Sequence, residues 1–79
     1  MGMREILEKR GLYYKAFETK PDQGNPTIVS VEFLVSLCEN SDEETREMME
    51  KNVQTLDETD GDIMAYLEHV GRNIIEPLQ

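Results

Sequence analysis

The stretch "TIVSVEFLVSLCEN", residues 27–40, decides the fold, because a strand and a helix compete for the same residues. In a strand, every second residue would be apolar, as Val29, Val31 and Phe33 are. In a helix, Ser30 would be the N-cap, Asn40 would mark the end, and one apolar stripe would form from Val31, Leu34, Val35 and Cys38. The helix accounts for more of the residues, and we therefore predict it.

The rest of this helix is mostly apolar as well. Phe33 and Leu37 point away from the Val31 stripe, and the polar arc holds only Glu32, Ser36 and Glu39. A helix with so narrow a polar arc is expected to be central and nearly buried. The strand stays open in one form, a short pairing of residues 13–19 with residues 27–30.

The chain before this stretch divides into a helix and a loop. Residues 3–10 predict a first helix, in which Glu5 and Lys9 stand four apart in the favourable order. Gly11 either ends this helix or lies within a longer one that continues through residues 12–17. Residues 12–19 are aromatic and could equally form a strand, and residues 20–26, "KPDQGNP", are predicted to be a loop.

The chain after the stretch begins with an acidic helix. The segment "SDEE", residues 41–44, matches a capping box, with Ser41 as N-cap and Glu44 three residues on. We predict that this helix runs to about Leu56. Its core face holds Met49, Val53 and Leu56. Its opposite face carries Glu43, Glu47 and Glu50.

A last helix is predicted from about Gly61 to Glu76. Its narrow apolar arc holds Ile63, Leu67, Val70 and Ile74, and three further residues widen that arc to about 180°: Met64, Tyr66 and Ile75. Gly71 lies inside the arc, where a glycine costs about 1 kcal/mol relative to alanine. The simplest compensation is close approach of another helix. We therefore expect self-association as a homodimer through Ile63, Leu67, Gly71 and Ile74.

Length and composition fit one small domain that spans residues 1–79. The sequence predicts a mostly α-helical domain of three to four helices, in which a short β-like or irregular N-terminal segment is left open. Its single cysteine excludes an internal disulfide. Without a signal peptide or a long apolar run, we expect a soluble, cytoplasmic protein with no membrane association.

The net charge of −9 is unevenly distributed along the chain. Residues 1–20 hold five bases and three acids, a net of +2, whereas residues 21–79 hold three bases and fourteen acids, a net of −11. A nucleic-acid binder needs a basic face, so we expect no direct contact with nucleic acid. A charged partner is expected to be a basic protein.

Residues 57–68, "DETDGDIMAYLE", look at first like a calcium loop. Such a loop needs oxygen ligands at positions 1, 3 and 5, glycine at 6 and glutamate at 12. If Gly61 is position 6, positions 1 and 12 are both leucines; if Asp57 is position 1, the glycine falls one place early. We therefore interpret the stretch as a helix start, with Asp60 as N-cap and Asp62 in the first turn.

No combination of residues forms a recognisable catalytic set. His69, the only histidine, falls on the polar face of the last helix, with no visible nucleophile and orienting acid around it. Cys38 falls on an apolar stripe, as a buried structural thiol would. We therefore expect no metal, no cofactor and no enzymatic activity.

Two functions remain open. The first is a non-enzymatic, acidic protein-binding module, an inhibitor or regulator of a basic partner that handles nucleic acid. Its docking surface would consist of Glu43, Glu47, Glu50, Asp57 and Glu58. The alternative is a structural or assembly protein that acts through the self-association described above. Against both stands the simpler interpretation that the acids only keep a small protein in solution.

Overall fold

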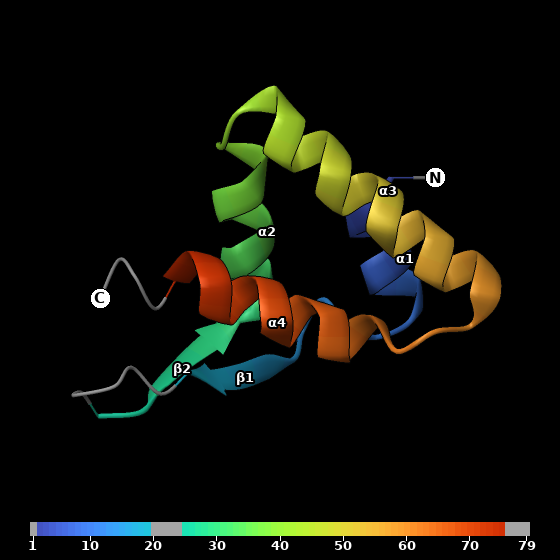
Figure 1. Ribbon diagram of the computed structural model, residues 1–79. Helices are drawn as coiled ribbons and strands as arrows, with labels where there is room; N and C mark the ends of the chain where they lie inside the picture. Colours follow the sequence, from blue (N-terminus) through green and yellow to red (C-terminus); the bar gives the residue numbers. More distant parts are fainter. Residues whose placement is uncertain (1, 20–24, 76–79) are drawn as a thin grey trace.

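The computed structural model describes residues 2–19 and 25–75 and shows a mostly α-helical domain (Figure 1). These residues form α1 (Met3–Lys9), β1 (Ala16–Thr19), β2 (Thr27–Ser30), α2 (Val31–Glu39), α3 (Glu43–Thr59) and α4 (Ile63–Ile75). In Figure 1, α2 rises from the sheet, α3 descends from the far end of α2, and α4 returns across the sheet. This arrangement confirms the predicted fold class.

The stretch 27–40 forms both of the competing structures, one after the other. The helix is confirmed, and the Ser30 hydroxyl caps it by accepting a hydrogen bond from the Phe33 N–H at 3.1 Å. The predicted stripe lies fully buried in the core: Val31, Leu34, Val35 and Cys38. The expectation of a nearly buried helix is wrong, because neighbouring elements cover α2 along one side only, and Phe33 on the other side is 55% exposed.

The strand left open by the sequence is confirmed in a shortened form. β1 and β2 pair antiparallel, with Phe17 opposite Val29 and both side chains in the core. The Val31 N–H donates to the Lys15 carbonyl at 2.9 Å, which carries the ladder to the first residue of α2. The hairpin therefore fixes where α2 starts.

α1 ends where a glycine allows the chain to turn. Gly11 adopts a φ of 73°, in the left-handed region that favours glycine. The Leu12 N–H then donates to the Leu7 carbonyl at 2.8 Å and closes the last turn. The longer helix through residues 12–17 is therefore not formed. α1 packs against α3 and contributes three buried residues to the core: Met3, Ile6 and Leu7.

The N-cap of α3 is one residue later than predicted. The carboxylate of Asp42, and not the hydroxyl of Ser41, accepts a hydrogen bond from the Thr45 N–H at 2.8 Å. Ser41 is engaged elsewhere, because its hydroxyl donates to the Leu37 carbonyl at 2.8 Å and closes the end of α2. Ser41 thus closes the C-terminal end of α2, and Asp42 caps the N-terminal end of α3.

The turn between α3 and α4 also differs from the prediction, both in where the last helix begins and in which residue caps it. α3 extends to Thr59, and Asp60 is its C-cap in the left-handed conformation, with a φ of 57°. The N-cap role predicted for Asp60 belongs to Asp62, whose carboxylate accepts from the Ala65 N–H at 3.0 Å. α4 therefore begins at Ile63, two residues later than expected. The predicted end at residue 76 lies outside the described residues.

The core lies between the sheet and the inner faces of the helices. α3 buries Met49 and Val53 as predicted, with Leu56 half-buried beside them. α4 contributes buried side chains from Ile63, Leu67, Val70 and Ile75. One continuous cluster thus includes residues from every helix and both strands.

Candidate functional site

The predicted acidic surface lies along the outer side of α3. Glu43 and Glu47 are exposed there, Glu50 is half-buried, and Glu58 is exposed near the end of the helix. Within the described chain, no lysine or arginine forms an ion pair with any of these four carboxylates. The charges of Glu43, Glu47 and Glu58 are therefore open to solvent and to a partner.

Asp57 was predicted to belong to the same docking surface, but it is engaged inside the molecule. Its carboxylate lies 2.6 Å from Arg10 Nε and 3.6 Å from Lys9 Nζ, and its side chain is only 19% exposed. The hydrogen bond from Arg10 holds the pKa of Asp57 below its usual value, and the Lys9 charge acts in the same direction. Asp57 joins α1 to α3 and is poorly placed to meet a partner.

Glu50 faces a polar hollow of about 370 Å³ between α1, α2 and α3. Arg4 on its wall lies 2.6 Å from Glu39 and 5.6 Å above the Tyr13 ring. Arg46 lies on the same wall. Acids and bases alternate around this hollow, and it therefore lacks the single sign of charge that would select a charged ligand.

The predicted self-association face of α4 lies mostly inside the monomer. Ile63 and Leu67 are buried, Ile74 is half-buried, and Gly71 is covered by the Phe17 ring of β1. The expected close approach at the glycine therefore exists, but its partner is a strand residue of the same chain and not another helix. The wide apolar arc that motivated self-association is used in folding.

The remaining candidate residues have structural roles or lie on the surface. Three acids of residues 57–68 have structural roles: Asp57 forms ion pairs, Asp60 is a C-cap and Asp62 is an N-cap. His69 is exposed and lies 3.1 Å from the Asn73 amide. Cys38 is fully buried, and burial raises the pKa of its thiol to about 11, with a smaller contribution from the charge of Glu39.

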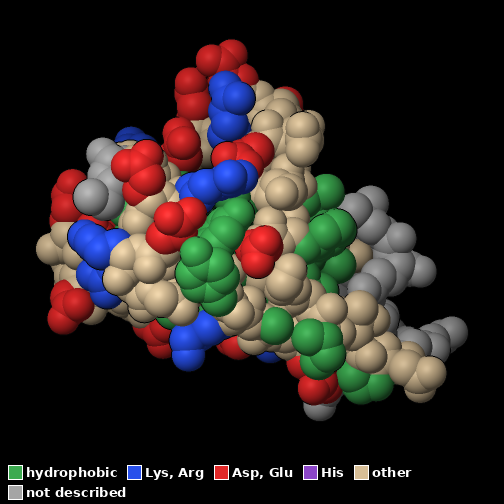
Figure 2. Space-filling view, turned by 180° about the vertical axis from the view of Figure 1, so that it is seen from behind, with side chains coloured by type: hydrophobic (Ala, Val, Ile, Leu, Met, Phe, Trp, Pro, Cys, Tyr) green, Lys and Arg blue, Asp and Glu red, His purple; other side chains and the backbone are tan. Residues whose placement is uncertain are grey.

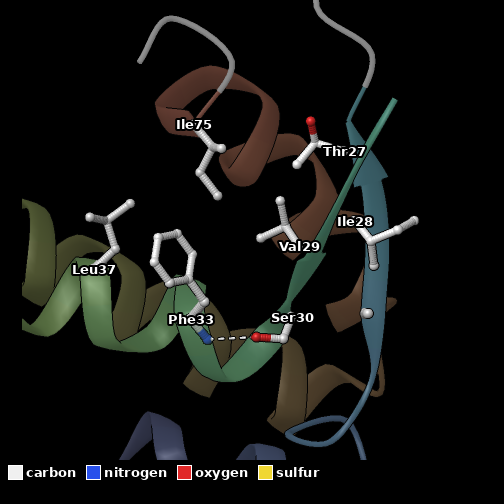
Figure 3. Close-up of a pocket in the computed structure, with 8 residues that line it drawn as sticks. Thr27, Ile28, Val29, Ser30, Phe33, Leu37 and Ile75 are labelled. Atoms are coloured by element: carbon white, nitrogen blue, oxygen red, sulfur yellow. Dashed lines mark hydrogen bonds between the residues drawn. The ribbon is translucent and has the colours of Figure 1, made fainter. Parts of the chain in front are cut away.

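An apolar groove of about 540 Å³ lies between β2, α2 and the end of α4. Its lining includes Ile28 and Phe33, which are 68% and 55% exposed. Figure 3 shows Phe33 and Leu37 from α2 and Ile75 from α4 pointing into the space beside Val29. In the rear view of Figure 2, hydrophobic side chains extend from the centre to the right and lower right, while most charged ones lie in the upper and left parts.

This groove was not predicted from the sequence. Its only signal was that Phe33 and Leu37 fall off the buried stripe of α2 and are nevertheless apolar. Large apolar side chains on an exposed patch mark interaction surfaces more often than isolated ones do. The groove and the acidic side of α3 are therefore the two surfaces that require a functional explanation.

No protein-family model, curated protein or solved structure matches this chain. No group of three metal-binding side chains comes together within residues 2–19 and 25–75. In the same residues, no helix combines the length and the apolar character needed to cross a membrane.

Proposed function

We propose that this chain is a non-enzymatic protein-binding domain that recognises a basic partner in the cytoplasm. In this proposal it inhibits or regulates a protein that itself handles nucleic acid. The observation that carries the proposal is the outer face of α3, where Glu43 and Glu47 are exposed without ion pairs in the described chain. The docking surface consists of Glu43, Glu47, Glu50 and Glu58, without Asp57.

These acids lie outside the core, so they can contribute to binding without contributing much to folding. Glu43, Glu47 and Glu58 lie on the opposite side of α3 from Met49 and Val53, which are fully buried. Glu50 lies at the margin of this side, beside the hollow toward α1. Exposed charges each contribute about 0 to 1 kcal/mol to stability, whereas together they accelerate association with a partner of opposite charge. A surface of this kind can therefore be neutralised without unfolding the domain.

The proposal is tested by affinity capture from a native lysate at low and high salt, with mass spectrometry of the captured proteins. The bait is either the wild-type chain or the variant Glu43→Gln/Glu47→Gln/Glu50→Gln. We expect the wild type to capture a basic protein at low salt and the variant to capture less of it. The difference should shrink at high salt, because salt screens exposed charges.

A matched control separates the α3 face from net charge alone. The variant Glu5→Gln/Glu8→Gln/Glu68→Gln removes the same number of charges from α1 and α4, so both variants change the net charge of −9 equally. It should retain capture. If both variants lose capture equally, or if the α3 variant captures as well as wild type at low salt, the α3 face is not a docking surface.

A further inference from the structure

Among the described residues, no strand pairs with the main-chain groups on the outer edge of β2. The hydrogen bond from the Val31 N–H to the Lys15 carbonyl joins two residues that face each other when the β1–β2 register is extended. Hydrogen-bonded and non-hydrogen-bonded pairs alternate along an antiparallel ladder, so Glu18 and Ile28 form a non-hydrogen-bonded pair. The N–H and C=O of Ile28 therefore point away from β1, where the described chain has no third strand.

Apart from its short length, this edge lacks the features that prevent a further strand from adding. Natural proteins protect open edges by keeping them very short, or with charged side chains, proline or a bulge. The four residues of β2, "TIVS", include no charge and no proline, and their register with β1 is continuous. The Ile28 side chain stands 68% exposed beside the open main chain.

The apolar groove follows the same edge. Four consecutive β2 residues, 27–30, line it, and successive side chains of a strand point to opposite faces. Residues from both faces of β2 therefore border the groove, which also reaches Ala16 of β1. In Figure 3, Ile28 projects on one side of the strand, and Phe33, Leu37 and Ile75 stand on the other. A strand added here would place alternate side chains against these two apolar surfaces.

Charge selects the occupant of the edge. Glu32 precedes Phe33 in α2 and is exposed, and the chain as a whole is strongly acidic. A second copy would bring a net charge of −9 against another −9, and like charges placed together oppose association. A segment with lysine or arginine at its ends would instead be attracted.

We propose that the β2 edge and its groove bind an extended, apolar segment of a basic protein, flanked by lysine or arginine, as a third strand of the sheet. Main-chain hydrogen bonds to Ile28 hold the segment, and the pocket of Phe33, Leu37 and Ile75 selects its side chains, as in other cases of strand addition. This inference rests on the proposed function, because the segment belongs to the same basic partner.

The test is selection from a phage-displayed library of random peptides on the immobilised 79-residue chain at low ionic strength. We expect the recovered peptides to alternate apolar and other residues and to carry lysine or arginine at their ends. Titration of a recovered peptide should shift the amide resonances of Ile28, Ser30 and Phe33. Recovery of no peptide, or of acidic peptides, overturns the inference.

Two substitutions at one position separate main-chain pairing from side-chain contact. Ile28→Pro removes the outward N–H, and because this N–H makes no bond to β1, the hairpin should survive, as proline is tolerated on edge strands. Ile28→Thr keeps the N–H. We expect Ile28→Pro to bind a recovered peptide about five- to tenfold more weakly than Ile28→Thr, the effect of one lost hydrogen bond. Equal affinities for the two variants overturn the inference.

The groove wall is tested by Phe33→Gln, which should also weaken binding, since it removes an apolar surface that is already half exposed. Thermal melts followed by circular dichroism verify that each variant is folded. If Ile28→Pro does not fold, N-methylation of alternate amides in the recovered peptide tests the same hydrogen bonds. Two peptides are compared, one N-methylated at the odd-numbered amides and one at the even-numbered amides. Only the peptide whose methylated amides face β2 should lose affinity, and unchanged affinity in both peptides overturns the inference.

The outcomes distinguish this inference from the proposed function. If recovered peptides are basic and respond to the α3 triple variant but not to Ile28→Pro or Phe33→Gln, the edge is not the site and the proposed function stands. If they bind the edge without lysine or arginine, the inference is overturned, and the capture experiment with the α3 variant still decides the proposed function. If sedimentation shows a dimer that Ile28→Pro dissociates, a second copy occupies the edge and the inference is overturned.

Discussion

Gly71 brings the middle of α4 against the aromatic ring of Phe17. A Cβ atom added at this glycine would stand 2.5 Å from Phe17 Cε2 and closer still to Cζ. The ring lies in the core, 5% exposed, so it has little space into which to move. The helix-propensity cost of about 1 kcal/mol for a mid-helix glycine is therefore offset by close packing between α4 and the sheet.

This packing predicts that Gly71→Ala lowers the free energy of unfolding by about 1 to 3 kcal/mol, the usual cost of overpacking a core. Urea denaturation of the two proteins measures the difference. Phe17→Leu should make the alanine less harmful, so a double-mutant cycle should show favourable coupling between the two substitutions. The interpretation fails if Gly71→Ala stabilises the protein by the 1 kcal/mol or so that helix propensity alone predicts.

At the scale of elements, the sequence locates the helices well and their caps less well. The stripe of α2, its Ser30 cap and the core face of α3 were all predictable, because hydrophobic spacing and cap chemistry are local signals. At both ends of α3, however, two cap-forming residues stand close together in the chain. The sequence predicted Ser41 as the N-cap of α3, where the structure has Asp42, and Asp60 as the N-cap of α4, where the structure has Asp62. Neighbouring helices decide between such residues, and one sequence does not contain that information.

The turn between α3 and α4 predicts opposite effects for its two aspartates. Asp62→Ala removes the carboxylate that accepts a hydrogen bond from the Ala65 N–H. This should lower the free energy of unfolding by about 1 kcal/mol, as loss of an N-cap does. Asp60→Gly should instead stabilise by about 0.5 kcal/mol, because glycine adopts a left-handed φ without strain. Thermal melts of the two variants measure the loss of stability expected for Asp62→Ala and the gain expected for Asp60→Gly. Loss of stability in Asp60→Gly would show that the Asp60 carboxylate, 3.7 Å from Arg10 Nη1, stabilises the folded state.

At the scale of the whole molecule, the basic start of the chain lies against its acidic remainder. Arg4 reaches Glu39 at the end of α2, and Lys9 and Arg10 reach Asp57 on α3. The charge asymmetry was visible in the sequence, as were the acids on the outer face of α3, but these pairings were not. The groove was also hidden, because Ile28, Phe33 and Ile75 are brought together only when the sheet, α2 and α4 assemble.

The contact between α1 and α3 makes the stability of the protein depend on acid pH. The pKa of Asp57 is held below the 3.8 of a free aspartate, chiefly by its hydrogen bond from Arg10. A carboxyl group with a lowered pKa in the folded state stabilises that state above the unfolded value, about 3.9. Its contribution is lost as pH falls through the lower pKa of the folded state.

Comparing wild type with Asp57→Asn isolates this contribution, because every other titratable group is common to both proteins. At neutral pH the variant should melt at a lower temperature, because asparagine keeps the shape but loses the charge that Lys9 and Arg10 face. As pH falls below about 4, the wild-type Tm should approach that of the variant, since Asp57 is then losing its own charge. Glu58→Gln is the matched control, because the Glu58 side chain is exposed and forms no ion pair within the described residues. Its Tm should follow that of wild type throughout. A constant gap between wild type and Asp57→Asn from neutral pH to pH 2 would show that the Asp57 charge does not hold α1 to α3.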